Sequence, residues 1–225
     1  PQGTATEDQL YSQDFEGEDI DPTQDTLTWS LSTDATFLSL SGQTVSGTPS
    51  NADVGSYYVN ITVTDGNGGS DWLNYTLTVE NVNDPPVIMT DVQDTATEDQ
   101  LYSLDLVAVD IDPTKDILTW GLNTDATFLT LDTIAEEISG TPTNDDVGFF
   151  TVNISVNDGN GGWDWLEFTL EVQNTNDAPQ INTTDLGEAT EDELFFIMME
   201  GWDMDPTNDD LTWSLDESPD WLTID

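Results

Sequence analysis

The amino-acid sequence predicts an all-β protein made of tandem β-sandwich repeats with about seven strands each. Three observations support this fold class. Short motifs return every 91 to 93 residues, apolar and polar residues alternate within each repeat, and clusters of Gly, Asn, Asp and Pro separate the alternating runs. No stretch has the spacing of apolar residues that an amphipathic helix needs. Many short strands of this kind bury their apolar faces by packing two sheets together.

The repeats are marked by motifs that recur in a constant order. Ala-Thr-Glu-Asp occupies residues 5–8, 96–99 and 189–192, and Asp-x-Asp-Pro-Thr occupies 19–23, 110–114 and 203–207. Ser-Gly-Thr-Pro occupies 46–49 and 139–142. The segments Asn-Val-Asn-Asp-Pro-Pro (81–86) and Asn-Thr-Asn-Asp-Ala-Pro (174–179) close the first two repeats. We therefore predict repeats at 1–84, 85–177 and 178–225, the first truncated at its start and the third being the first half of a repeat.

The second repeat shows the expected strands most clearly. We predict strands at 87–89, 101–109, 117–122, 128–131, 134–138, 149–156 and 165–172, with a turn at 157–162. In the last two strands an apolar side chain stands at every second position, from Phe150 to Val156 and from Leu166 to Val172. Large aromatic residues usually belong to the core, so we expect four tryptophans to fill the space between the sheets: Trp29, Trp72, Trp120 and Trp165.

The chain is strongly acidic. It has 47 Asp and Glu residues, one Lys or Arg and no His, which gives a formal net charge of −46. This excludes nucleic acid as a partner and argues against an anionic membrane surface. The longest apolar run, Leu194–Met199, is too short to span a bilayer, so we expect no membrane insertion. Either bound divalent cations or high external salt should neutralise the charge. If bound cations neutralise the charge, the acidic residues should be clustered. Adaptation to high salt predicts instead a uniformly acidic surface.

The segments 81–86 and 174–179 are predicted to be short, rigid joints between repeats. Asn and Asp supply oxygen atoms and favour turns, and the prolines prevent a strand from continuing. A hard cation such as Ca²⁺ prefers oxygen ligands of this kind. The alternative for most loop Asp and Asn residues is a turn or a solvated surface. With no Cys in the chain, stability has to come from the cores and from metal.

Together these motifs resemble those of cadherin-like tandem repeats in prokaryotic surface proteins, including arrays that end in Val-Asn-Asp-Ala-Pro and dystroglycan-type cadherin-like domains. The resemblance covers essentially the whole chain. It implies seven-strand Greek-key sandwiches of the cadherin or Ig type, arranged end to end, with Ca²⁺ at the joints. It also implies a role in adhesion or surface architecture instead of catalysis.

The resemblance further implies the ligands at each joint. At the first joint they are Glu7, Asn51 or Asp53, Asn81, Asn83, Asp84, Asp110, Asp112 and Asp158. At the second joint they are Glu98, Asn144 or Asp146, Asn174, Asn176, Asp177, Asp203 and Asp205. Asp19, Asp21 and Asp65 would face a preceding repeat. Asn81 and Asn174 stand where the family usually has Asp, a departure that concerns the number of ions and their affinity.

Asn-x-Ser/Thr sequons predict glycosylation of a secreted protein at Asn60, Asn74, Asn153 and Asn182. Asn60 and Asn153 occupy equivalent positions, and strand alternation should point both side chains away from the core.

The leading hypothesis is a non-enzymatic structural or adhesive rod that is secreted or displayed on a cell surface. Its partners would be neighbouring repeats or subunits of the same array, with glycans or another cell surface as further candidates. The alternative is a carbohydrate- or partner-binding module that uses Trp163 and Trp202, which break the repeat pattern. We expect no enzyme, because His, Cys and Arg are absent and only a carboxylate-pair glycosidase would remain. The half repeat is expected to continue in a longer array or to receive strands from another subunit.

Overall fold

The computed structural model describes residues 3–22, 24–114, 116–207 and 209–224. As predicted, the secondary structure of these residues is almost entirely β, and the helical turns in them are two short 3-10 helices. By spatial proximity the chain divides into two compact units. One unit contains residues 1–87, 108–119 and 156–164, and the other contains 88–107, 120–155 and 165–225. Residues of the second sequence repeat therefore belong to both units.

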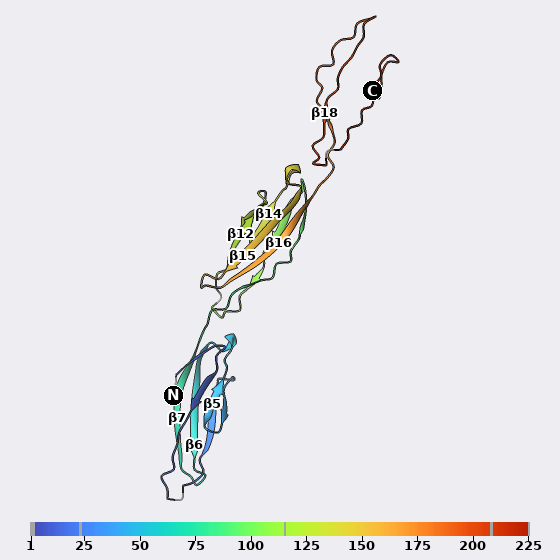
Figure 1. Cartoon of the computed structure of the whole chain (residues 1–225). Coiled ribbons are helices and arrows are strands. Elements are labelled where there is room, and N and C mark those ends of the chain that lie inside the picture. The colour runs from blue at the N-terminus through green and yellow to red at the C-terminus, as the bar shows by residue number, and fades with distance from the viewer. Residues whose placement is uncertain (1–2, 23, 115, 208, 225) are drawn as a thin grey trace. The chain divides into compact units, whose positions relative to one another are not determined.

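The first repeat folds into two sheets (Figure 1). One sheet has the strand order β1-β7-β6-β3 and the other has the order β2-β5-β4. The elements are β1 (Thr4–Thr6), β2 (Tyr11–Asp14), β3 (Thr28–Thr33), β4 (Ser39–Ser41), β5 (Thr44–Gly47), η1 (Asn51–Asp53), β6 (Gly55–Thr64) and β7 (Ser70–Glu80). The long antiparallel pair β6–β7 forms the centre of the first sheet. β1 adds to the edge of β7 as a parallel strand.

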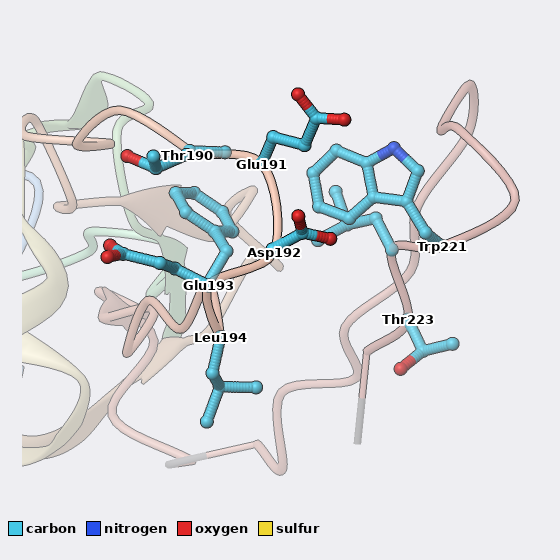
Figure 2. A pocket seen from close by; sticks show the side chains of 10 residues that line it. Thr190, Glu191, Asp192, Glu193, Leu194, Trp221 and Thr223 are labelled. Atoms are coloured by element: carbon cyan, nitrogen blue, oxygen red, sulfur yellow. The ribbon is translucent and has the colours of Figure 1, made fainter.

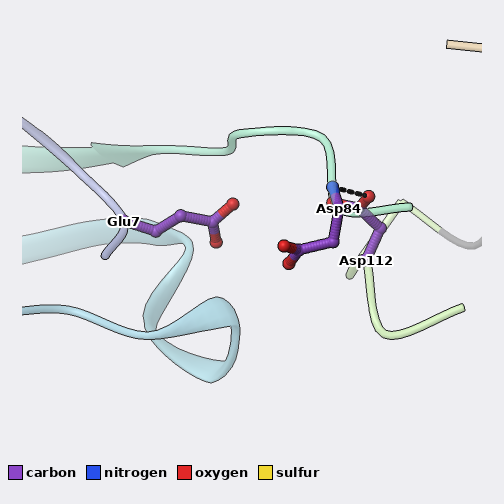
Figure 3. Close-up of side chains that lie close together, drawn as sticks. All are labelled: Glu7, Asp84 and Asp112. Carbon is purple, nitrogen blue, oxygen red and sulfur yellow. Dashed lines mark hydrogen bonds between the residues drawn. The ribbon is translucent and has the colours of Figure 1, made fainter. Parts of the chain in front are cut away.

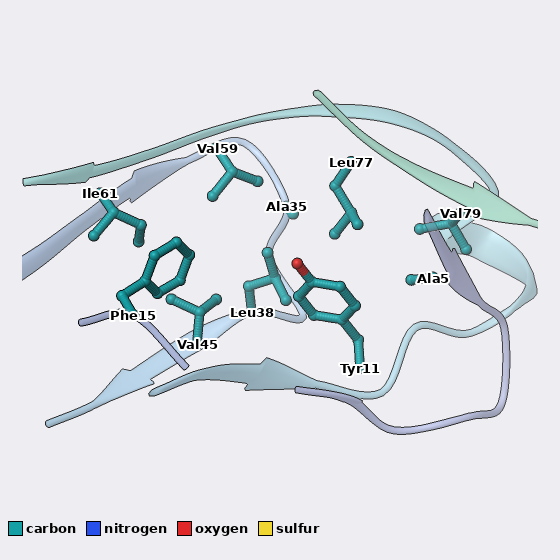
Figure 4. Packing of buried hydrophobic residues seen from close by; sticks show 10 residues of the cluster. All are labelled: Ala5, Tyr11, Phe15, Ala35, Leu38, Val45, Val59, Ile61, Leu77 and Val79. Atoms are coloured by element: carbon teal, nitrogen blue, oxygen red, sulfur yellow. The ribbon is translucent and has the colours of Figure 1, made fainter. Parts of the chain in front are cut away.

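The core of the first repeat lies between these two sheets (Figure 4). Every second residue in the facing parts of β6 and β7 is buried, namely Val59 and Ile61 in one strand and Leu77 and Val79 in the other. They pack with Val45 of β5 in one cluster of buried side chains. This alternation follows from strand geometry, which points successive side chains to opposite faces.

The second repeat has the same two-sheet arrangement. Its sheets have the orders β12-β15-β16-β9 and β10-β14-β13, and β8 and β11 form a small additional pair. The elements are β8 (Val87–Ile88), β9 (Thr95–Thr97), β10 (Tyr102–Asp105), β11 (Ala108–Val109), β12 (Thr119–Thr124), β13 (Thr130–Asp132), β14 (Glu137–Gly140), η2 (Asn144–Asp146), β15 (Gly148–Asn157) and β16 (Trp163–Gln173). The expected fold class, tandem β-sandwiches of the Ig or cadherin type, is confirmed.

One strand prediction needs correction, and one strand was missed. The single strand expected at 101–109 is two strands, because the chain changes partner: β10 pairs with β14, and β11 pairs with β8. β9 was not predicted, since three residues are too few to show alternation. It forms because the Ala-Thr-Glu-Asp segment pairs in parallel with the end of β16.

The expectation that four tryptophans fill the cores is correct for two of them. Trp120 is buried, and Trp29 is half-buried against the core of the first repeat. Trp72 and Trp165 are 62% and 60% exposed, so that prediction was wrong for them. The reason is the alternation of side chains along a strand. The core-facing residues near the end of β7, such as Leu77, have odd numbers, and Trp72 has an even number, so its side chain lies on the opposite face.

The Ser-Gly-Thr-Pro motif has a steric explanation. A Cβ atom at Gly47 would lie 2.1 Å from the carbonyl oxygen of Phe37, and a Cβ at Gly140 would lie 2.1 Å from that of Phe128. Since no Cβ can approach a backbone atom so closely, glycine is required where β5 and β14 end.

The third repeat has less regular structure. In its described residues the strands are the short pair β17 (Gln180–Ile181) and β18 (Gly201–Trp202). Phe195 contacts Trp221 edge to face, with ring centroids 6.2 Å apart. Several large apolar side chains remain exposed, with Leu194 at 95%. In the part of the chain that the structure describes, no helix has the length and apolar character needed to cross a membrane.

Candidate metal centre

Glu7 is carried to its position by the pairing of β1 with the end of β7. Its N–H donates to the carbonyl oxygen of Glu80 at 3.1 Å, and its Oε1 accepts a hydrogen bond from the N–H of Val82. The Glu7 side chain is only 1% exposed, and its Oε2 is buried with no hydrogen-bond partner. Burying a carboxylate oxygen removes its hydration, and without a hydrogen-bond partner this loss of solvation free energy is not compensated. Glu7 is therefore a candidate metal ligand.

Two further carboxylates converge on Glu7 (Figure 3). One oxygen of each of Glu7, Asp84 and Asp112 lies within 4.8 Å of the others. The N–H of Asp84 donates to Asp112 Oδ2 at 2.7 Å, and Asp112 is itself only 3% exposed. Burial raises the pKa of the Glu7 carboxyl; the Val82 N–H opposes this rise, and the charges of Asp84 and Asp112 add to it. Carboxylates this close repel one another, and a cation would remove that repulsion.

Asp112 also belongs to a second group of carboxylates. Oxygens of Asp110, Asp112 and Asp116 lie within 4.8 Å of one another. The N–H of Asp112 donates to Asp110 Oδ1 at 2.9 Å, while Oδ2 of Asp110 and Oδ2 of Asp116 are buried without partners among the described residues. Because Asp112 is shared, the two groups form one continuous acidic centre.

Two asparagine amides hold carboxylates of this centre. Asn51 Nδ2 donates to Asp84 Oδ2 at 2.8 Å, and Asn81 Nδ2 donates to Asp112 Oδ1 at 2.8 Å. The Oδ1 atoms of both asparagines are buried without partners. The amide N–H groups therefore partly compensate the negative charge, while the carbonyl oxygens of the same side chains stay unused.

Asn83 plays a similar part toward Asp158, which is buried in the loop after β15. Asn83 Nδ2 donates to Asp158 Oδ2 at 2.7 Å, and the N–H groups of Asn160 and Gly162 donate to Oδ1. The hydrogen bond from Asn83 is the main cause that lowers the pKa of Asp158, with burial opposing it and the backbone N–H groups assisting. We call the whole group the Glu7 cluster: Glu7, Asn51, Asn81, Asn83, Asp84, Asp110, Asp112, Asp116 and Asp158.

The same arrangement is built a second time. Glu98 is 1% exposed, its Oε1 accepts a hydrogen bond from the Thr175 N–H, and its Oε2 has no partner. The Asp177 N–H donates to Asp205 Oδ2 at 2.8 Å, as Asp84 does to Asp112. We call this group the Glu98 cluster: Glu98, Asn144, Asn174, Asp177, Asp203 and Asp205.

The asparagines of the Glu98 cluster repeat those of the Glu7 cluster. Asn174 Nδ2 donates to Asp205 Oδ1 at 2.9 Å, and Asn144 Nδ2 donates to Asp177 Oδ2 at 2.8 Å. Both Oδ1 atoms are again buried without partners. Two independent stretches of sequence thus fold into one pattern of carboxylates, amides and unpartnered oxygens.

The sequence left two choices open, Asn51 or Asp53 at the first joint and Asn144 or Asp146 at the second. In the structure Asn51 and Asn144 lie in the clusters. Asp53 and Asp146 are engaged at the starts of η1 and η2. Asp53 Oδ2 accepts hydrogen bonds from the N–H and the hydroxyl of Ser50 at 2.9 and 2.8 Å, and Asp146 does the same with Thr143. The acid is used to cap a turn, and this leaves the neighbouring amide to face the cluster.

The remaining predicted residues have local hydrogen bonds. Asp203 Oδ1 accepts from the Asp205 N–H at 3.1 Å, and Asn176 Nδ2 donates to the Asp177 carbonyl oxygen at 2.8 Å. Asp19 Oδ1 accepts from the N–H of the exposed Asp21 at 2.8 Å, and Asp19 Oδ2 is buried without a partner. Asp65 accepts from two loop N–H groups, as Asp158 does.

Asp116 is the cluster residue that sequence reasoning missed. A signal was present, because an acid stands four residues after the second Asp of each Asp-x-Asp-Pro-Thr motif, at Asp25, Asp116 and Asp209. The loop between the motif and β12 brings Asp116 back to Asp110 and Asp112, a return that spacing alone does not reveal.

Buried charge is confined to the clusters. Among the described residues, the buried charged side chains are Glu7, Glu98, Asp112, Asp158 and Asp205. Carboxylates are rarely buried without a partner of opposite charge. Each of the five lies in the Glu7 or the Glu98 cluster, so the burial pattern makes these clusters the candidate sites.

The other candidate sites are less enclosed. A pocket of about 640 Å³ in the third repeat is lined by residues such as Glu191, Glu193, Leu194 and Trp221 (Figure 2), and none of the predicted metal ligands lines it. Trp163 and Trp202 are each about half exposed.

The four sequons lie in different surroundings. Asn60 and Asn74 stand opposite each other across β6 and β7. Asn153 is half-buried and donates to Glu167 Oε2 at 3.2 Å, while Asn182 is exposed.

Comparison with known proteins agrees with this architecture. Residues 1–80 match the family described as Putative Ig domain, and residues 83–171 match the family described as Bacterial Ig domain. A comparison with curated proteins found no match. The structure of human CDH23 EC21-23 is similar with a TM-score of 0.54 and 17% identity, over 81% of this chain and 70% of that one.

Two other solved structures show lower similarity. Drosophila N-cadherin EC1-4 has a TM-score of 0.46 and 14% identity, over 82% of this chain and 52% of that one. An endo-fucoidan hydrolase from glycoside hydrolase family 107 has a TM-score of 0.34 and 23% identity over 76% of this chain, which spans 27% of the hydrolase. The two family matches and the shared fold of human CDH23 support one conclusion: the chain consists of tandem Ig-like or cadherin-like β-sandwich repeats.

Proposed function

We propose that the Glu7 and Glu98 clusters bind Ca²⁺, and that the chain is a segment of an extracellular, non-enzymatic protein with a structural or adhesive role. The observation that carries this proposal is the burial of five carboxylates, two of which have an oxygen atom with no partner. Ig-like and cadherin-like domains are typically extracellular and typically lack enzymatic activity, which supports the second part of the proposal.

The donor set of the Glu7 cluster suits Ca²⁺ in particular. It offers carboxylate and amide oxygens, and the chain contains no His or Cys that would favour zinc or copper. Unpartnered oxygens come from five of its residues: Glu7, Asn51, Asn81, Asp110 and Asp116. Ca²⁺ takes six to eight oxygen ligands in an adaptable geometry, whereas Mg²⁺ demands a near-ideal octahedron and keeps its waters. Side chains of different length, such as Glu, Asp and Asn, can satisfy the adaptable coordination of Ca²⁺ more easily than the octahedron that Mg²⁺ requires.

A bound ion would connect successive sequence repeats. The Glu7 cluster combines Glu7 and Asn51 of the first repeat with Asp110 and Asp112 of the second. An ion held by both groups would resist bending of the segment 81–86. Ca²⁺ sites of extracellular modules have dissociation constants of roughly 10⁻⁴–10⁻³ M, so the ion would act as a structural element and not as a signal.

The test is a Ca²⁺ titration of the full chain, followed by calorimetry and by thermal unfolding. At 10 mM Ca²⁺ and the affinities above, each site should add about 1.4–2.7 kcal/mol to the free energy of unfolding. The radius of gyration, measured by small-angle scattering, should change when a chelator removes the ion.

The double variant Glu7→Gln and Glu98→Gln is the critical comparison, with Glu80→Gln as the matched control on an exposed glutamate. The double variant should fold, because it removes repulsion, and should lose the stabilisation by Ca²⁺. Molar Na⁺ serves as the comparison for salt adaptation. If Na⁺ stabilises the chain as much as Ca²⁺ does, or if the double variant responds to Ca²⁺ like the wild type, the proposal is wrong.

A further inference from the structure

The outer face of the sheet β1-β7-β6-β3 differs from the rest of this acidic chain. The strand register places serine, threonine and asparagine at nearly all of its outward positions, together with Tyr58 and Trp72. Glu80, at the end of β7, is the one carboxylate among these positions. Since the chain carries 47 acidic residues, a sheet face with a single acid is a local exception that salt adaptation does not explain.

The two aromatic side chains flank a pair of amides. Trp72 is paired with Thr62, Asn74 with Asn60, and Thr76 with Tyr58 on three successive rungs of the same face. At 3.3–3.4 Å per residue, Tyr58 and Trp72 stand roughly 13 Å apart along the strands. Tyr58 is 48% exposed and Trp72 is 62% exposed, so both rings are accessible. A ligand that contacts both rings has to be an extended chain.

The polar groups between the rings are partly ordered and partly available. Asn60 Nδ2 donates to Tyr58 Oη at 3.1 Å, and Thr62 Oγ1 donates to Asn60 Oδ1 at 3.3 Å. Asn74 is exposed, and its side-chain amide has no hydrogen bond to any residue that the structure describes. An amide of this kind offers a donor and an acceptor side by side, which complements neighbouring hydroxyl groups of a sugar.

We propose that this face binds a neutral oligosaccharide chain, with Trp72 and Tyr58 stacking on sugar rings and Asn74 hydrogen-bonding to hydroxyl groups. An uncharged ligand suits a face with a single carboxylate, whereas a polyanion is repelled by the net charge of −46. A second copy of the chain is repelled for the same reason. A protein partner is disfavoured because protein interfaces are depleted in serine, which is abundant here, and enriched in arginine and methionine, which are absent from this face.

The aromatic position recurs in the second repeat. Trp165 of β16 is the equivalent of Trp72, 93 residues later, and it is 60% exposed. A single exposed tryptophan needs no explanation. Its return at the same strand position, outside both cores, makes an outward-facing ring a feature that the two repeats share. This inference does not depend on Ca²⁺ binding.

The test is native affinity electrophoresis of the full chain, produced in a host that adds no N-glycans. The gels contain hydroxyethylcellulose, galactomannan or laminarin as neutral polymers, or alginate as an anionic one. We expect at least one neutral polymer to retard the chain and alginate to leave its mobility unchanged. The double variant Trp72→Ala and Trp165→Ala should weaken the binding at least tenfold, and Phe196→Ala, which truncates another exposed ring, should not.

Thermal unfolding of each variant shows whether the loss of binding comes from loss of structure. Trp72→Phe with Trp165→Phe keeps an aromatic ring at both positions and should retain most of the affinity. Trp72→Leu with Trp165→Leu removes the rings and should lose it. Three results would overturn the inference: no retardation by any neutral polymer, equal retardation by alginate, or unchanged binding in a folded alanine double variant.

Discussion

Replacing Asn81 by Asp tests the most unusual feature of the Glu7 cluster, an amide where a carboxylate would serve a cation. In the structure Asn81 Nδ2 lies 2.8 Å from Asp112 Oδ1, and Asn81 Oδ1 is buried without a partner. The amide thus stabilises Asp112 without an ion. Asn81→Asp removes this hydrogen bond and adds a second negative charge beside Asp112.

Both changes should destabilise the ion-free chain. A hydrogen bond to a charged group contributes about 1.5–3 kcal/mol. Two like charges 4 Å apart repel by about 1 kcal/mol in bulk water and by about 4 kcal/mol at an effective dielectric constant of 20. Because Asp112 is only 3% exposed, the value lies well above the bulk-water limit. We expect a total loss of about 3–5 kcal/mol.

Ca²⁺ should offset part of this loss. The new carboxylate would offer a charged ligand in place of an amide oxygen, so we expect at least tenfold tighter Ca²⁺ binding, or about 1.4 kcal/mol. Urea unfolding with and without chelator measures the stability, and calorimetry measures the affinity. Asn74→Asp on the exposed sheet face is the control and should change stability by no more than about 0.5 kcal/mol. If Asn81→Asp leaves the ion-free stability unchanged, the amide does not hold Asp112 and the reasoning is refuted.

Three further predictions concern the fold and its surface. Gly47→Ala should cost at least about 1–3 kcal/mol because its Cβ would meet the Phe37 carbonyl oxygen, and urea unfolding against the control Gly42→Asn checks this. Burial and the charge of Asp94 raise the pKa of Tyr102 to about 12, above the usual value of about 10, so its contribution to stability is complete below pH 10 and is lost as the pH rises toward 12. Tyr102→Phe should therefore lose stability less steeply over this range, and an unchanged slope would contradict the assignment. In a glycosylating host, Asn60 and Asn74 share one rung about 4.5–5.5 Å wide and should not carry glycans together, which mass spectrometry of glycopeptides can disprove by finding both occupied.

Much of the candidate site could be predicted from sequence because its residues belong to motifs. The positions of Glu7, Asp84 and Asp112 are each marked by a short motif that returns after a constant interval. What the motifs did not reveal is which loop residue turns inward. Asn51 and Asp53 are two positions apart, and the choice between them depends on the hydrogen bonds of Ser50 at the start of η1.

Asp116 shows the same difficulty in another form. Its distance along the chain from Asp112 is as compatible with a solvated turn as with a ligand. The loop brings the two carboxylates within 4.8 Å of each other, and the types of the three residues between them do not specify this return. Local sequence therefore indicated an acidic loop, and only packing made Asp116 part of the cluster.

The sequence by itself determined the fold class, the repeat length and the identity of most cluster residues. These properties are one-dimensional: alternation selects strands, and recurrence at 91 to 93 residues reveals the repeats. The tertiary structure alone decided which faces are covered and which atoms are left without partners. Trp72 is exposed because its side chain lies on the face of β7 opposite to that of Leu77. Glu7 is buried where its carboxylate accepts a hydrogen bond from Val82, 75 residues away. Burial is a property of contacts between distant segments, so composition and spacing could not settle it.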